Sequence, residues 1–430
     1  MKKISLFLKI ALRNLLRNKV RSLITILMIA SGLGGIMFLR GFTDGAYQQA
    51  IENFTSTYTG HLQIARQGFS QTMDPGLLMT RREIEGIAAD LKGRANIKSV
   101  SSRIFTQGLA STATASQGIV LSGISPADEL KVSRLGHFVK DGSFLNEGDD
   151  GEIILGRELA KILKVSLGEK IVVFTQSYYG SLEAASFRIK GFIESGGRDI
   201  DRYGGFITLD AARKLLNYPE GAVSSLIAVF RDIKYVPMAS EGLKKKLGPA
   251  GLGYGKPNHG LLASGLEVKT WDELGPEMKD WISFYDAIIE IIMIVLLIVV
   301  AVGIMNTVLM GVIERTYEFG LMQAMGTRRT QIVGMVFSEA CILAVLGILA
   351  GIILGGLSIK YFHGAGINLS WYAQVRTQFY LGQYVYPVLS WKFFLKTTVF
   401  LFIDTLVISI YPAYKAGFLE PIQAIRYGQR

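Results

Sequence analysis

The chain has 430 residues, of which 50% are hydrophobic and 19% are charged. This composition is too apolar for an ordinary water-soluble protein, but it includes long polar stretches, so it predicts a membrane protein with a large soluble part. The net charge of +11 would suit a nucleic-acid binder, yet the basic residues lie where membrane topology requires them, and we expect no nucleic-acid partner.

The first 21 residues carry seven Lys or Arg and no acid. Apolar residues between Ile4 and Leu15 share one helix face and basic residues another, which predicts an amphipathic helix in the membrane interface over residues 1–21. A basic flank that only sets topology is an equal alternative. The uncharged run Ser22–Leu39 predicts the first span, residues 22–43, as an uncleaved anchor because it is longer than the apolar core of a signal peptide.

Residues 44–281 have the composition of a soluble domain and predict an α+β fold. One helix is expected to start at Ser125, with Pro126 in its first turn, and another at Asp210. The Gly-rich segment 248–265 indicates a flexible loop. The predicted strands are Gly118–Leu121, Glu152–Leu155, Lys170–Thr175, Phe187–Ile193, Phe206–Leu209 and Leu226–Phe230.

Motifs of catalysis, nucleotide binding and metal binding are missing from the sequence. The four histidines, His61, His137, His259 and His363, are scattered without metal-ligand spacing, and no Walker A or GxSxG motif is present. We therefore expect no catalytic residue, no metal and no bound cofactor in this chain.

Three more apolar segments follow the large domain, and each approaches the roughly 20 residues that cross a bilayer. The last of them contains Lys396 and Asp404, and Pro412 is expected to end it. The predicted spans are residues 284–313, 331–359 and 392–411, with a short segment at 314–330, a loop at 360–391 and a tail at 412–430.

Basic residues near the spans predict the orientation of the chain. Thirteen Lys or Arg lie in the N-terminus, the 314–330 segment and the tail, whereas the loop Tyr361–Trp391 has only Arg376. Both termini and the short segment are therefore expected in the cytoplasm, with the large domain periplasmic. The expected fold class is a membrane α-helical protein with four transmembrane helices and a large α+β extracytoplasmic domain.

The 314–330 segment is the most informative part of the chain. Glu318 in a first turn and Gly326 just past an end indicate a short helix between two spans. Its residues at one-turn spacing form a face suited to a groove of a partner, although a turn that merely joins two spans is the alternative. These residues are Leu321, Ala324, Met325 and Arg328.

Two features inside the spans are candidates for packing or function. Gly347, Gly351 and Gly355 form a ridge of small residues that permits close helix contact, either within the chain or across a dimer. Asp404 is costly inside a span, so it is either functional or hydrogen-bonded, for example to Asn306.

The residues around the short helix resemble a known family. Glu314, Arg315, Glu318, Gly320 and Gly326 match the coupling region of the MacB/FtsX-type (type VII) permeases of ABC transporters. One departure is Phe319, which stands where the family pattern has isoleucine.

The large domain is similar to that of the lipoprotein-releasing LolC/LolE permeases within this family. The similarity covers nearly the whole chain and is carried by Gly60–Ile64, Val120–Pro126, Ile153–Ala160, Phe187–Phe192 and Thr270-Trp271. The tail from Tyr411 to Arg426 resembles the C-terminal signature of the same family.

The resemblance implies a non-catalytic permease subunit of the inner membrane. Two copies of a separate ABC ATPase would bind ATP and Mg, and a second permease, identical or homologous, would complete the assembly. ATP-driven motion would enter through the coupling helix, whose implied residues are Glu314, Arg315, Glu318, Gly320, Leu321, Ala324, Met325, Gly326 and Arg328.

The cargo implied by the LolC/LolE likeness is a lipoprotein or lipid, taken from the membrane and passed to a periplasmic lipoprotein carrier. Two alternatives stay open. One is a MacB-like exporter of peptides or small molecules, and the other is an FtsX-like mechanotransmitter that regulates a periplasmic cell-wall hydrolase. No residue of a substrate entry can be assigned from the sequence.

Overall fold

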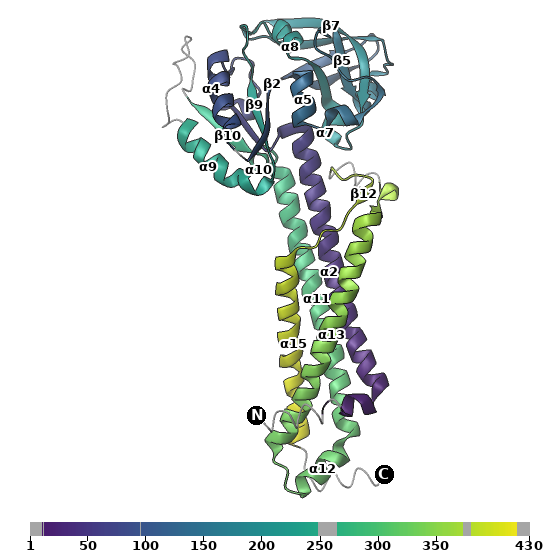
Figure 1. Cartoon of the computed structure of the whole chain (residues 1–430). Coiled ribbons are helices and arrows are strands. Elements are labelled where there is room, and N and C mark those ends of the chain that lie inside the picture. The colour runs from purple at the N-terminus through teal and green to yellow at the C-terminus, as the bar shows by residue number, and fades with distance from the viewer. Residues whose placement is uncertain (1–10, 12, 95, 248–264, 373–379, 419–430) are drawn as a thin grey trace. The chain divides into compact units, whose positions relative to one another are not determined.

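The structure is a computed structural model, and it describes residues 11, 13–94, 96–247, 265–372 and 380–418. The chain divides into two compact units (Figure 1). One comprises Met1–Tyr47, Ile282–Asn368 and Tyr384–Arg430, and the other comprises Gln48–Trp281 and Leu369–Gln383. Each unit is described by itself.

The first unit is built on four long helices with mean hydropathies between 1.9 and 3.2, and each is long and apolar enough to cross a membrane. This confirms the expectation of four spans. Polar residues continue each helix beyond the apolar run that predicted it. The helices are α2 (Lys19–Phe54), α11 (Pro276–Glu314), α13 (Arg329–Ala365) and α15 (Trp391–Gly417).

These helices run alongside one another and share one apolar core (Figure 1). Ile29 and Leu33 of α2 meet Ile304 of α11, Ile348 of α13 and Leu401 of α15, and all five side chains are almost fully buried. Such a contiguous cluster joins the four spans into one packed body.

Pro412 lies inside α15, so the prediction that it ends the fourth span is wrong. A proline within a helix costs about 3 kcal/mol or more through its missing N–H and its ring. Here the next turn is held by packing, because Ala413 and Ala416 are fully buried in a cluster with Phe319 and Ile332. The burial of this last turn offsets the cost of the proline.

The second unit is an α+β domain, which confirms the expected class. Its sheet has the strand order β10-β1-β9-β2-β3-β8-β5-β7-β4, with β6 pairing to β2 and β7. The pairs β3–β8 and β5–β7 are parallel. The strands are β1 (Leu62–Arg66), β2 (Ile97–Ser111), β3 (Ser116–Ile124), β4 (Val139–Gly142), β5 (Glu152–Gly156), β6 (Lys170–Gln176), β7 (Leu182–Ile193), β8 (Gly204–Thr208), β9 (Ser225–Phe230) and β10 (Leu266–Thr270).

Short helices flank this sheet. They are α3 (Phe69–Thr72), α4 (Arg81–Lys92), α5 (Pro126–Val132), α6 (Arg157–Leu163), α7 (Arg198–Tyr203), α8 (Leu209–Leu216), α9 (Val236–Leu247) and α10 (Trp271–Leu274). The predicted loop at 248–265 lies almost wholly outside the described residues.

Six strands were predicted near their observed positions, but β1, β2, β4 and β10 were not. The helix expected to begin at Asp210 begins one residue earlier, because the hydroxyl of Thr208 accepts a hydrogen bond from the Ala211 N–H at 3.1 Å and caps it. The strand before it therefore ends at Thr208 rather than Leu209.

A buried ion pair ties β2 to α5. The Arg103 side chain is 1% exposed and donates Nε to Glu129 Oε2 at 3.0 Å and Nη2 to Oε1 at 2.5 Å, while Glu129 is 0% exposed. This bidentate geometry satisfies both charges away from water. Because β2 pairs with β9, β3 and β6, the pair lies at the strand that joins the two halves of the sheet.

Candidate functional site

The predicted short helix is present as α12 (Thr316–Ala324), between the end of α11 and the start of α13. It begins two residues before Glu318, so Glu318 lies in its first turn. After it, Gly326 has a φ of +93°, a conformation that favours glycine, and its N–H donates to the Gln323 carbonyl at 3.0 Å. The segment therefore has defined ends between two rigid spans.

One face of α12 is packed into the helical unit. Phe319 is fully buried beside Val312, Ile332 and Ala413, and Gly320 is buried next to it. Phenylalanine at this position, the departure noted in the sequence, fills the junction between α11, α13 and α15. Phe319 therefore packs α12 tightly against these three helices.

The opposite face of α12 is exposed. Met325 is 71% exposed and Leu321 is 43% exposed, and Ala324 and Arg328 are also exposed. Tyr317, which the sequence analysis missed, extends this face by one turn and is 46% exposed. Its signal was the four-residue spacing to Leu321. We call Tyr317, Leu321, Ala324, Met325 and Arg328 the exposed α12 face.

Arg315 is the centre of a charge network under α12. Its side chain is 9% exposed and donates Nη1 to Glu339 at 2.9 Å and Nε to Glu318 at 3.2 Å. Its guanidinium also lies 4.9 Å from the Phe319 ring centroid. Glu339, on α13, was missed in the sequence, where its signal was an acid inside the predicted third span, residues 331–359.

Two arginines near the start of α2 extend this network. Arg17 donates to Glu318 at 2.6 Å, and Arg21 pairs with Glu314 at the end of α11. The two arginines are four residues apart in the sequence, as are the two glutamates. Together with the Arg315 contacts, these pairs form the ion clamp: Arg17, Arg21, Glu314, Arg315, Glu318 and Glu339.

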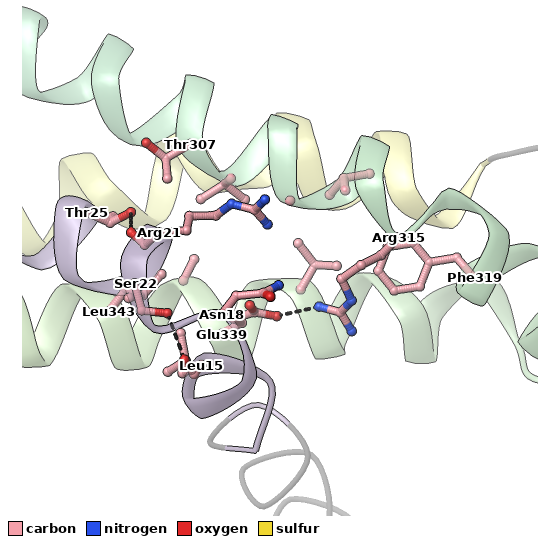
Figure 2. A pocket seen from close by; sticks show the side chains of 15 residues that line it. Leu15, Asn18, Arg21, Ser22, Thr25, Thr307, Arg315, Phe319, Glu339 and Leu343 are labelled. Carbon is pink, nitrogen blue, oxygen red and sulfur yellow. Dashed lines mark hydrogen bonds and ion pairs between the residues drawn. The ribbon is translucent and has the colours of Figure 1, made fainter. Parts of the chain in front are cut away.

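A small cavity of about 30 Å³ lies within the ion clamp. Figure 2 shows Asn18, Arg21, Arg315 and Glu339 around it. Its size would hold roughly two water molecules, and the polar side chains in its mixed lining offer them partners. Residues 1–10 and 12 of the predicted amphipathic helix are outside the described residues, whereas residues 13–17 are helical and lead into this region.

The charges around Glu318 control its ionisation. Partial burial opposes the charged form, but hydrogen bonds from Arg17 and Arg315 outweigh this effect and hold the pKa of Glu318 below its ordinary value of 4.5. A carboxyl with a lowered pKa contributes stability that is fully present above its ordinary pKa and is lost as the pH falls through the lowered value. The Glu318 contacts are therefore intact at neutral pH.

Changing Glu318 to glutamine is expected to speed amide hydrogen exchange in residues 13–24 by about two- to fivefold, because an exposed ion pair contributes only about 0.2–1 kcal/mol. Mass spectrometry of the exchanged chain measures this. Wild type should lose the same protection only below pH 4.5, as Glu318 becomes protonated. E277Q, the same change at an exposed glutamate in the first turn of α11, should have no effect; equal exchange in the two variants would refute the link.

The predicted glycine ridge lies against α2 of the same chain. A Cβ on Gly347 would meet Ile29 at 2.6 Å, one on Gly351 would meet Leu33 at 2.9 Å, and Gly355 is similarly close to α2. The ridge is thus occupied by contacts within the chain, which leaves it no surface for a dimer seam.

Replacing Gly351 with leucine is expected to destabilise the helical unit by about 1–3 kcal/mol, because the added side chain meets Leu33 and the Ala30 carbonyl. The melting temperature of the detergent-solubilised chain measures the loss. Gly356 is the matched control, since a Cβ there meets nothing within 4 Å. If G356L lowers the melting temperature as much as G351L, close packing is not the cause.

Asp404 and Asn306 lie apart. Asp404 borders an apolar groove of about 380 Å³ with Ala301 and Met305 of α11, and its Oδ2 has no hydrogen-bond partner among the described residues. Asn306 follows Met305 directly, and consecutive residues of a helix are rotated by about 100° about its axis. Asn306 is therefore exposed in a different groove. The hydrogen bond considered from the sequence is not formed within the described part of the chain.

The charged groups of the ion clamp are held in ion pairs. Its ionised groups pair with one another, and no cluster of His, Cys, Asp and Glu suited to a metal occurs among the residues that the structure describes. His61 has a structural role in the other unit, where its Nδ1 accepts the Phe230 N–H at 2.9 Å and burial lowers its pKa to about 4. The arrangement joins α12 to the spans through packing and ion pairs.

Two family models match the chain. Residues 22–246, slightly more than half of the sequence, match the MacB-like periplasmic core domain, and residues 290–421 match the FtsX-like permease C-terminal domain. The second match contains α12 and the ends of the spans on either side of it.

Relatives also match over nearly the whole of this chain. An uncharacterized ABC transporter permease of Methanocaldococcus jannaschii is 21% identical over 97% of this chain and 96% of its own length. The lipoprotein-releasing system transmembrane protein LolC of Neisseria meningitidis is 21% identical over 96% of each chain. The macrolide export ATP-binding/permease protein MacB of Bdellovibrio bacteriovorus is 24% identical over 96% of this chain, which spans 60% of that protein.

Proposed function

Since the chain belongs to the MacB/FtsX-type family of ABC transporter permeases, we propose that it is a membrane subunit driven by ATP hydrolysis in a separate ATPase subunit. The chain is a multi-pass membrane protein with a MacB-like α+β domain. The thirteen-to-one distribution of basic residues supports cytoplasmic termini, a cytoplasmic α12 and a periplasmic large domain.

The observation that carries the proposal is the two-sided character of α12. The centre of its exposed face is apolar, because Met325 and Leu321 lie there, and no described residue of the chain covers them. Its other face is locked to the spans through buried Phe319 and the Arg315–Glu339 pair. A partner that pushes the first face therefore moves α11, α13 and α15 through the second.

In this proposal, the ATPase subunit binds the exposed α12 face, and two ATPase copies act on two permease protomers. The ion clamp passes the motion of α12 to α2 through Arg17 and Arg21. Because α2 and α11 each continue from the helical unit into the large domain, they are the covalent route by which that motion reaches it.

The cargo we propose is a lipoprotein, released from the inner membrane to a periplasmic carrier. The likeness to a lipoprotein-releasing subunit over 96% of both chains supports this choice. Export of a small molecule is the second candidate, because a macrolide-export protein matches 96% of this chain.

The test is purification of the tagged full chain from its own membranes in mild detergent, with mass spectrometry of all retained proteins and lipids. The expected result is an ATPase subunit in near-equal amount, a permease partner, and acylated proteins. Recovery of the ATPase with a cell-wall hydrolase and no acylated protein would replace lipoprotein release by mechanotransmission. A preparation without any ATPase subunit would overturn the role of α12.

A further inference from the structure

A second groove lies beside the ion clamp, between the start of α2 and the end of α11, with a volume of about 730 Å³. Arg17, Lys19 and Arg21 line it, and Glu314 is the only acid among the described residues of its lining. Arg21 already pairs with Glu314, whereas Lys19 is exposed and forms no ion pair with any described residue. The groove therefore carries an excess of positive charge.

The other part of the groove is apolar and open. Val20 is 74% exposed, Ile24 is 51% exposed, and Met310 faces them from α11 and is 50% exposed. Leu27, 52% exposed, continues the same stripe along α2 at helical spacing. At 1.5 Å per residue, Val20 to Leu27 covers roughly 10 Å of the span.

We propose that this groove binds an anionic phospholipid of the surrounding bilayer, with its phosphate at Lys19 and Arg21 and an acyl chain along Val20, Ile24 and Leu27. The order of the residues supports this assignment. The cations lie where α2 begins and α11 ends, at the depth of the headgroups, and the apolar stripe runs from there into the span.

The charges favour an anionic headgroup over a zwitterionic one. A choline or ethanolamine group would meet Lys19, whose charge no described residue pairs, beside two arginines that are already paired with carboxylates. The phosphate of a lipid whose headgroup has no cation instead gains Lys19 and the N–H donors of Arg21 that no described residue accepts. Asn306, otherwise an unexplained polar residue in a span, lines the same groove and can donate its amide to the lipid.

The apolar stripe also separates a lipid from a soluble partner. An acidic segment of a soluble protein could reach Lys19, but it could not follow Ile24 and Leu27 into the hydrocarbon. An acyl chain can lie along that apolar surface without leaving a polar group unsatisfied. The combination of a cationic end and a lipid-facing stripe thus fits one molecule with both parts.

The test measures the binding of defined lipids to the purified full chain by native mass spectrometry. Phosphatidylglycerol and phosphatidylcholine with identical acyl chains are titrated separately. Wild type is expected to bind phosphatidylglycerol at least tenfold more tightly. Lys19→Gln should weaken phosphatidylglycerol binding about fivefold and leave phosphatidylcholine unchanged, as expected for one cation near an anionic lipid.

Lys415→Gln is the matched control, because Lys415 is an exposed lysine in the last turn of α15. It should leave both affinities unchanged. Val20→Glu, which places an acid at an exposed position in the groove, should abolish the preference for phosphatidylglycerol.

Equal binding of the two lipids by wild type would overturn the proposal, as would equal losses in the Lys19 and Lys415 variants. A third result also counts against it. If Lys19→Gln leaves lipid binding intact but reduces the recovery of a partner protein from membranes, the groove is a protein contact.

Discussion

Changing Met325 to aspartate is expected to reduce the amount of ATPase subunit that co-purifies with the chain at least tenfold. Met325 is 71% exposed at the end of α12, so the substitution leaves the packing of this chain intact. In the proposed complex it would instead bury an unpaired charge in the centre of the contact. Losing an apolar anchor and burying a charge each cost about 1–3 kcal/mol or more.

Quantitative mass spectrometry of the purified complex measures this ratio. Met238 of α9 is the matched control, because it is 82% exposed in the large domain and the same substitution there should leave ATPase recovery unchanged. The melting temperature of both variants should equal that of wild type. Normal ATPase recovery with M325D would show that the partner binds elsewhere, and Leu321→Asp would then test the rest of the exposed α12 face.

Changing Arg103 to leucine is expected to destabilise the large domain by about 3–5 kcal/mol. The substitution leaves Glu129, which is 0% exposed, as a buried charge without its partner. Domains are stable by only about 5–15 kcal/mol, so this loss removes a large share of the total. Faster hydrogen exchange in β2 and α5 of the full chain, together with a lower unfolding midpoint, would show the effect.

Arg81→Gln is the control for this prediction. Arg81 pairs with Glu85 on the surface of α4, where both side chains are about two-thirds exposed, and the expected loss is below about 0.5 kcal/mol. The double variant R103L/E129L should regain most of the stability lost in R103L, since no charge is then left buried. If the double variant is less stable than R103L, an unpaired Glu129 is not the source of the loss.

Much of the large domain could be predicted because several of its strands are recognisable from the hydrophobic pattern of a few adjacent residues. Ile153, Ile154 and Leu155 of β5 form an uninterrupted apolar run, as expected for a strand buried on both faces. β2 could not be found in this way, because Ile97–Ser111 is rich in Ser and has no regular alternation of apolar and polar residues. It is a strand because β9, β3 and β6 satisfy its backbone, and two of these partners, β9 and β6, are distant in sequence.

The candidate site divides in the same manner. The short helix, its end at Gly326 and its exposed residues were predictable, because helix ends and one-turn spacing depend on neighbouring residues alone. The ion clamp was not, since Arg17 meets Glu318 across about 300 residues of chain. At Pro412 the local rule that a proline ends a helix gave a wrong prediction. The helix continues there because the turn that follows Pro412 is buried.

By itself, the sequence determined that four apolar helices cross a membrane, that a large α+β domain interrupts them, and that a short helix connects two of them. Each of these follows from hydropathy, periodicity or capping over a few adjacent residues. Only the tertiary structure decided which charges pair around Arg315, which helix covers the glycine ridge, and which groove Lys19 and Asn306 share. These features depend on contacts between residues that are far apart in the chain, and such contacts cannot be read from a local sequence pattern.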